Sequence, residues 1–167
     1  MSTWSQAFVR QAASGLDAYY LLTKNPLPVS HQLHYLQMWL EKLCKAYLWR
    51  PEADYDELRK KHRVVAHVLP RLIAEHWRRI GFDRQPEMKL IRELCREIDL
   101  LHPQIDDDGK RPENVEYPWP GTSGDIEVPA SWTFQLAKRL HSRSGKLLLR
   151  AAGSLTREPT VWGGTRA

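Results

Sequence analysis

The sequence lacks the long apolar runs of membrane proteins and the leader pattern of secreted ones. No stretch approaches the roughly 20 consecutive apolar residues that a membrane span requires. The first residues, MSTWSQAFVRQ, contain no basic stretch followed by an apolar run, so they do not resemble a signal peptide. We therefore expect a cytoplasmic protein that makes no contact with a membrane.

Cysteine and the usual cofactor motifs are also scarce. Cys44 and Cys95 are the only cysteines, and both lie in helical patterns without metal-ligand spacing. This favours a reduced pair of small core residues over a disulfide. The seven histidines include no HExxH motif, and the chain has no glycine-rich phosphate loop and no nucleophile elbow. The sequence therefore predicts neither a metal site nor a cofactor.

Positive charge is concentrated at the C-terminal end. Residues 1–137 hold 18 Lys and Arg against 19 Asp and Glu, whereas residues 138–167 hold seven basic residues and one acid. Such a cationic arm suits a phosphate backbone or an acidic partner protein. A terminal helix that merely solvates itself with Lys and Arg would have the same composition. The basic residues of the arm are Lys138, Arg139, Arg143, Lys146, Arg150, Arg157 and Arg166.

Apolar residues recur with the 3.6-residue period of helices, and no strand pattern of any length is present. Hydrophobic residues make up 42% of the chain, which is ample for one core. Pro70 lies inside the third predicted helix, where it should cause a kink or a break. The predicted helices cover about 3–22, 30–49, 55–80, 86–101 and 131–152.

The segment after His102 follows no period. It has five prolines and three glycines in the 28 residues 103–130. Tyr117 and Trp119 would be costly to leave in water, so we expect them to anchor this loop on the helices, although they could instead stack on a base. The sequence thus predicts an all-α fold: an up-and-down bundle of about five helices with one long Pro/Gly-rich loop (about 102–129).

The same pattern predicts one helical domain over 1–152 and a flexible basic tail over 153–167, because periodicity fades beyond Gly153. Within the domain, the second helix has a polar row, His34, Gln37, Glu41 and Lys45, on one side. Glu41 and Lys45 have the spacing of an exposed ion pair. Alternatively, the row faces a partly buried seam, where the pair would need further partners to offset desolvation.

Two Arg–His spacings would suit metal-free RNA cleavage, in which a His moves a proton and an Arg stabilises the phosphate charge. Arg71 and His76 would lie on different sides of a continuous helix, since five residues advance about 500°. Arg96 and His102 fit better. His102 follows the fourth helix, whose C-terminal partial charge favours imidazolium.

Three segments in this order are similar to a known family. HYLQMWLEKLCKAYL followed by HRVVAHVL resembles the second and third helices of the HEPN superfamily, including its Glu-Lys pair, here Glu41-Lys42. NVEYPW, residues 114–119, looks like the loop that many members have after the third or fourth helix, often as Arg-Tyr-Pro. The resemblance covers roughly residues 10–150.

The resemblance implies a small, all-helical, usually dimeric protein of toxin–antitoxin or antiviral defence systems. Many members are metal-independent endoribonucleases with an Arg-x(4–6)-His motif completed across a dimer, and others are binding or assembly modules. This chain has Glu116 where Arg would stand in Arg-Tyr-Pro, and a carboxylate cannot supply the cation that phosphate cleavage needs. Here the Arg96-x5-His102 segment fits the catalytic spacing.

We therefore expect a HEPN-like binding or assembly module of a prokaryotic defence or toxin–antitoxin system. It would act as a homodimer or with a partner protein and contact RNA or DNA. One alternative is a metal-independent endoribonuclease that uses Arg96 and His102, and another is an unrelated helical scaffold. The expected binding residues are His34, Glu41, Lys45, Tyr117, Trp119, Arg139, Arg143, Lys146 and Arg150.

Overall fold

The computed structural model describes residues 3–83, 86–105 and 112–163. Within these ranges the chain is mainly helical, so the expectation of an all-α fold is confirmed. In the same ranges no helix combines the length and apolar character that a bilayer crossing demands. The helices are α1 (Trp4–Leu22), α2 (Val29–Leu48), α3 (Tyr55–Lys60), α4 (Val65–His76), α5 (Met88–Asp99), α6 (Gln135–Leu140) and α7 (Arg143–Arg157).

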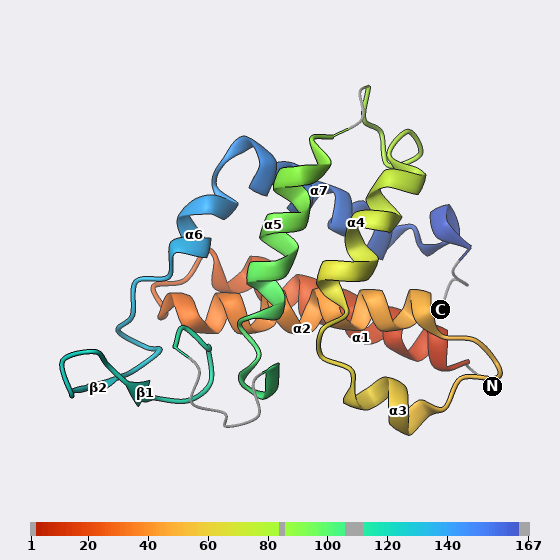
Figure 1. Cartoon of the computed structure of the whole chain (residues 1–167). Helices are drawn as coiled ribbons and strands as arrows, with labels where there is room; N and C mark the ends of the chain where they lie inside the picture. The colour runs from red at the N-terminus through yellow and green to blue at the C-terminus, as the bar shows by residue number, and fades with distance from the viewer. Residues whose placement is uncertain (1–2, 84–85, 106–111, 164–167) are drawn as a thin grey trace.

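The long helices form two antiparallel pairs that cross. Helices α1 and α2 lie side by side, and α4 and α5 cross α2 steeply, with α7 behind them (Figure 1). This arrangement differs from the expected up-and-down bundle. Short connections force successive helices to run antiparallel. The connection from α2 to α4, residues 49–64, is long and contains α3, so α4 is free to turn across α2.

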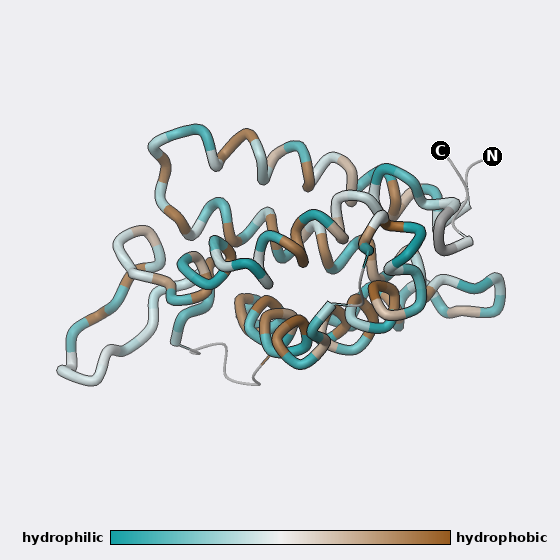
Figure 2. The backbone as a smooth tube through the Cα atoms, turned by 90° about the horizontal axis from the view of Figure 1, so that it is seen from above, coloured by the Kyte–Doolittle hydropathy of each residue, from teal (hydrophilic) through white to brown (hydrophobic). Residues whose placement is uncertain are grey.

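The core lies where these helices meet, and each long helix alternates between hydrophilic and hydrophobic residues along its length (Figure 2). Trp39 on α2 is fully buried, and its Nε1 donates a hydrogen bond of 2.8 Å to Thr156 Oγ1 near the end of α7. This bond joins α2 and α7, 117 positions apart in the chain, through the core. Further buried side chains from α1, α2, α4, α5 and α7 are Leu16, Leu33, Leu36, Leu40, Leu43, Leu69, Ile73, Ile91, Leu94 and Leu148.

The predicted break at Pro70 is wrong. Helix α4 continues through Pro70, and the break lies upstream, at residues 61–64, between α3 and α4. The carboxylate of Asp99 on α5 accepts hydrogen bonds from the backbone N–H groups of Val65 at 3.1 Å and Ala66 at 3.0 Å. A side chain from another helix therefore starts α4 in place of a local cap.

The predicted fifth helix is also divided. Helix α6 ends at Leu140, and α7 begins after Ser142, whose Oγ accepts a hydrogen bond of 3.1 Å from the N–H of Gly145. Helix α7 then runs through Gly153 to Arg157, and the 3-10 helix Pro159–Trp162 follows. The expected tail boundary at 153 is thus wrong, because core packing continues to Thr156. Residues 164–167 of that tail lie outside the described residues.

The segment predicted as a long loop contains little regular structure. It has the 3-10 helix Pro103–Ile105 and a small antiparallel sheet of β1 (Trp119–Pro120) and β2 (Ile126–Glu127). Asn114 is fully buried, and its Oδ1 accepts from the N–H groups of Glu116 at 3.0 Å and Tyr117 at 2.7 Å. Residues 106–111 lie outside the described residues.

The two loop aromatics differ in exposure. Trp119 is 3% exposed and lies edge-on to Trp132, with ring centroids 5.4 Å apart, so its predicted anchoring role is confirmed. Tyr117 is 55% exposed, so the same prediction is wrong for Tyr117. Tyr117 still belongs to the turn that Asn114 holds, through its N–H bond to Asn114 Oδ1, whereas Trp119 lies in β1.

Candidate functional site

The polar row of α2 lies mostly in a buried seam. Gln37, Glu41 and Lys45 are each 2% exposed, whereas His34 is partly exposed. The seam lies between α2, helix α3 and the chain around His102, which line one pocket of about 460 Å³. Of the two interpretations that the spacing allowed, a buried seam is therefore the correct one for these three residues. An open ion pair on the surface is excluded.

Glu41 is the centre of this seam. Its Oε1 accepts hydrogen bonds from Lys42 Nζ at 2.7 Å and from Lys45 Nζ at 2.8 Å, and its Oε2 accepts from Gln37 Nε2 at 2.8 Å. Burial alone raises the pKa of Glu41, but the two ammonium groups outweigh it, and the pKa falls to about 2. Lys45 Nζ also donates to the carbonyl of Arg59 at 2.7 Å. The buried charges are therefore compensated by close partners.

Two histidines complete the cluster. His62 Nδ1 lies 3.4 Å from Glu41 Oε2, and the His62 and His102 rings stack with centroids 3.9 Å apart. The N–H of Gln104 donates to His102 Nδ1 at 3.1 Å. Burial, followed by the nearby His62, lowers the pKa of His102 to about 4. Burial therefore outweighs the helix C-terminus, which was expected to favour the imidazolium form of His102.

These contacts define which ring nitrogens remain available for a ligand. A neutral imidazole has one donor and one acceptor nitrogen. Because Nδ1 of His102 accepts from Gln104, its proton lies on Nε2, which is then a donor. If Nδ1 of His62 donates to Glu41, its Nε2 is an acceptor. The cluster thus offers a donor and an acceptor side by side, the arrangement needed for proton transfer or hydrogen bonding to a ligand.

Glu41, His62 and His102 also bring one possible metal-binding atom each to within 4.8 Å of one another. No short sequence motif contains these three residues, so the grouping was not predictable from the sequence. A dication is nevertheless poorly matched to the cluster. Two ammonium groups already contact the carboxylate, and a metal on His102 Nε2 would force a proton onto Nδ1, opposite the N–H of Gln104. The geometry favours proton chemistry over metal binding.

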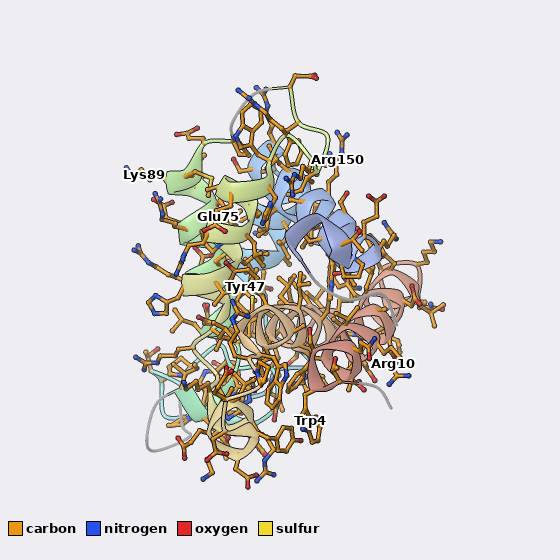
Figure 3. The ribbon with its side chains drawn as sticks, turned by 90° about the vertical axis from the view of Figure 1, so that its right-hand side faces the viewer. Trp4, Arg10, Tyr47, Glu75, Lys89 and Arg150 are labelled. Atoms are coloured by element: carbon orange, nitrogen blue, oxygen red, sulfur yellow. The ribbon has the colours of Figure 1, made fainter. Side chains whose placement is uncertain are left out.

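The rest of this pocket is cationic and aromatic. Lys42 and Arg59 line it together with the rings of Phe8 and Tyr55. Tyr55 is held in place by Trp4, which stacks on it with ring centroids 3.9 Å apart and lies beside α3 (Figure 3). At another edge of the pocket, His34 Nδ1 lies 3.5 Å from Glu116 Oε1. Glu116, the departure from Arg-Tyr-Pro, thus contacts the first member of the α2 row.

A second pocket, of about 560 Å³, lies between α4 and α5. We call it the arginine groove, because five basic side chains line it, four from the two helices and Arg63 from the connection before α4. Arg96 belongs to this groove, whereas His102 lines the pocket over Glu41. The structure therefore does not bring together the pair with the catalytic spacing. The basic residues of the groove are Arg63, His67, Arg71, Arg92 and Arg96.

The groove contains one carboxylate, Asp99, which is buried and bonded to the start of α4. Burial raises the pKa of Asp99 to about 6, although the backbone N–H groups of Ala66 and Val65 oppose this. Arg71 has one distant ion pair, to Glu75 at 3.8 Å. Within the described part of the chain, Arg92 and Arg96 make no ion pair. The groove thus has uncompensated positive charge.

The C-terminal basic residues are spread over separate contacts. Arg139 pairs with Glu93 at 3.3 Å and with Glu97. Arg150 lies over the ring of Phe82, 5.4 Å from its centroid (labelled in Figure 3). Arg143 and Lys146 are exposed on α7. Acidic partners therefore compensate Arg139, whereas Arg143, Lys146 and Arg150 share one exposed face of α7. Arg166 lies outside the described residues.

Comparisons with protein-family models, curated proteins and solved structures find no match to this chain.

Proposed function

We propose that this chain is a HEPN-like helical module that binds nucleic acid, with the arginine groove as the binding site. The observation that carries the proposal is the cationic lining of the groove. Guanidinium groups bind phosphate oxygens in bidentate fashion and stay charged at every physiological pH. Two such groups, Arg92 and Arg96, lie one helical turn apart on α5 and face the α4 side of the groove.

The electrostatic cost of placing arginines close together on α5 supports an anionic ligand. Like charges one turn apart on a helix destabilise it by about 0.2–0.5 kcal/mol. A phosphate bound by Arg92 and Arg96 would remove the repulsion between these two side chains. The floor of the groove is apolar, with Ala66, Pro70 and Ala74, and it would accept a sugar or base beside the phosphates.

The resemblance to HEPN proteins extends the proposal to a cellular setting. The module would act in a prokaryotic defence or toxin–antitoxin assembly, as a homodimer or with a partner protein. Nucleic-acid binding and assembly are compatible, because the arginine groove and the exposed face of α7 are separate surfaces.

Binding is tested by fluorescence anisotropy with labelled RNA and DNA over a range of salt concentrations. We expect binding at low salt. For single strands, the logarithm of the affinity should fall by about 0.7 per phosphate contact for each tenfold rise in salt concentration. Arg92→Glu with Arg96→Glu should abolish binding. Arg143→Glu with Lys146→Glu makes the same change of net charge on α7 and should retain most of it. No affinity for either nucleic acid at low salt would refute the proposal.

A second candidate function, metal-independent RNA cleavage, is favoured by the stack of His62 and His102 beside Glu41. We infer that these histidines, rather than Arg96 with His102, would carry it. His62 Nε2 would take the proton of a ribose 2′-hydroxyl, the 2′-oxygen would attack phosphorus, and the 5′-oxygen would leave and take a proton from water. His102 Nε2–H and Lys42 would stabilise the phosphate charge.

Cleavage is tested in EDTA, with a substrate that has one 2′-deoxy position as the chemical control. Cleavage that is lost in His62→Gln and blocked by the 2′-deoxy group would support the assignment. Cleavage that survives in both His62→Gln and His102→Gln would exclude it. Purified protein that binds RNA without cleaving it would support the binding function and exclude the cleavage function.

A further inference from the structure

The arginine groove and the pocket over Glu41 are connected. A third pocket, of about 290 Å³, lies at the α3–α4 connection. It shares Arg63 and Ile105 with the arginine groove, and it shares His62 with the pocket over Glu41. The connection and the 3-10 helix Pro103–Ile105 meet at the lower ends of α4 and α5 (Figure 1). The three pockets therefore follow one another along a single path.

We propose that these three pockets form one continuous track for single-stranded nucleic acid, which runs from the arginine groove across the α3–α4 connection to the aromatic pocket over Glu41. The inference rests on the proposed function and deepens it, since it names the form of the ligand and a second subsite for it.

Positive charge continues along the whole path. The middle pocket is lined by four consecutive basic residues, 60–63, with the sequence KKHR. Lys60 has one weak exposed pair, with Glu57 at 3.8 Å, so its ammonium group remains accessible. Lys42 and Arg59 continue the charge into the last pocket. Closely spaced cations along a groove match the regular phosphates of an extended strand.

The aromatic end of the track selects a single strand. Phe8 and Tyr55 line the last pocket, and Trp4 fixes the Tyr55 ring by stacking at 3.9 Å with an angle of 21° between the planes. A preformed aromatic surface beside cations is the usual platform for an unstacked base. In a duplex the bases are stacked and paired, so their faces cannot reach Tyr55. The ligand class is therefore a flexible strand with exposed bases.

The length dependence of binding tests the track. Labelled oligouridylates and oligothymidylates from about 4 to about 16 nucleotides, the site sizes of small single-strand binding domains, are titrated by anisotropy. Short oligomers should bind the arginine groove alone. Longer ones should gain on the order of tenfold or more in affinity when they reach the aromatic pocket. A duplex of equal length should bind more weakly than the single strand, and the two oligomer series show whether the sugar matters.

Variants separate the two ends of the track. Lys60→Glu with Lys61→Glu should remove the gain with length and leave short oligomers unaffected, and Tyr55→Leu should weaken long oligomers on the order of tenfold. Lys138→Glu with Lys146→Glu is the matched control with the same change of charge. Circular dichroism of each variant verifies the fold.

Three results would overturn the track while the proposed function survives. These are affinity that does not rise with length, equal or tighter binding of the duplex, and equal loss in the control variant and in Lys60→Glu with Lys61→Glu. Failure of the proposed function itself is distinct, because then no oligomer of any length binds and the Arg92→Glu, Arg96→Glu variant behaves like the wild type.

Discussion

The carboxylate of Asp99 caps the first turn of α4 by accepting hydrogen bonds from the N–H groups of Val65 and Ala66, at 3.1 and 3.0 Å. Asp99 lies at the end of α5, 34 positions after Val65. One side chain therefore ends the connection from α3, starts α4 and joins the two helices that form the arginine groove.

This relationship predicts a large effect of Asp99→Ala. The substitution leaves two N–H groups at a buried helix start without partners, and it should lower the free energy of unfolding by about 2 kcal/mol. Urea unfolding measures it. Asp54→Ala removes the exposed local cap of α3 and should cost about 0.5 kcal/mol. Equal costs for the two variants would contradict the tertiary role of Asp99.

Two glycines of α7 should respond oppositely to alanine. A Cβ on Gly145 would lie 2.4 Å from the carbonyl oxygen of Arg139 and 2.5 Å from the Cα of Leu140, both backbone atoms. Gly145→Ala should therefore destabilise the corner between α6 and α7 by about 3 kcal/mol. A Cβ on Gly153 would meet only the flexible Arg157 side chain, at 3.5 Å. Gly153→Ala should leave the protein unchanged or up to about 1 kcal/mol more stable.

Thermal unfolding compares the two alanine variants directly. We expect a lower midpoint for Gly145→Ala and an equal or higher midpoint for Gly153→Ala. Tolerance of both substitutions would show that the corner before α7 is looser than its contacts imply.

Removing one member of the buried Glu41–Lys45 pair should lower the free energy of unfolding more than removing both. Glu41→Leu leaves the Lys45 ammonium buried without its carboxylate, and it should lower the free energy of unfolding by about 3–5 kcal/mol. Glu41→Leu with Lys45→Met replaces the pair by apolar groups of similar size and should recover much of that loss. The measurement is urea unfolding of both variants at neutral pH.

The exposed pair of Lys60 and Glu57 provides the comparison for this experiment, since Lys60→Ala should change stability by less than about 0.5 kcal/mol. A double variant no more stable than Glu41→Leu would mean that Lys45 contributes through its packing or its bond to Arg59 rather than through the charge of Glu41.

The lowered pKa of His102 predicts a pH dependence of stability. The folded protein keeps this imidazole neutral down to a pKa of about 4, whereas the unfolded chain takes up a proton below 6.5. The unfolded state thus binds more protons at acidic pH. The contribution of His102 to the free energy of unfolding is therefore complete above pH 6.5 and is lost as the pH falls toward 4. Because His102 is half-buried, we expect a total loss of about 2 kcal/mol by pH 4, of which about 1 kcal/mol falls between pH 7 and pH 5.

The comparison with His102→Gln isolates this contribution. Asp99 acts in the opposite direction, because burial raises its pKa to about 6 and its folded form takes up a proton in the same range. The prediction therefore concerns the difference between wild type and variant, measured by urea unfolding from pH 7 to pH 5, above the range in which Glu41 titrates. A difference independent of pH would contradict the burial of the neutral His102 ring.

The sequence alone was sufficient for the helical class and for the apolar stripe of the second helix. The leucines of α2 follow the helix period, and that period is set by local backbone geometry. The spacing left open whether Gln37, Glu41 and Lys45 are buried, and the structure decided this. The anchoring role of Trp119 also followed from the sequence, because a large aromatic ring is costly to expose.

Other features arise from contacts between segments that are distant in the chain. The break before α4 depends on Asp99, and the continuation of α7 to Arg157 depends on the bond between Trp39 and Thr156. Neither partner is visible within a helix-length window. Local signals therefore misplaced the break at Pro70 and the end of the domain at Gly153.

Both candidate sites are of this second kind. Periodicity indicated which leucines of α2 lie inward, but only the tertiary structure decided that His62 and His102 meet at Glu41 and that α4 and α5 place their arginines around one groove. The physical reason is that a helix period acts over a few residues, whereas the packing of whole helices determines which of their faces meet.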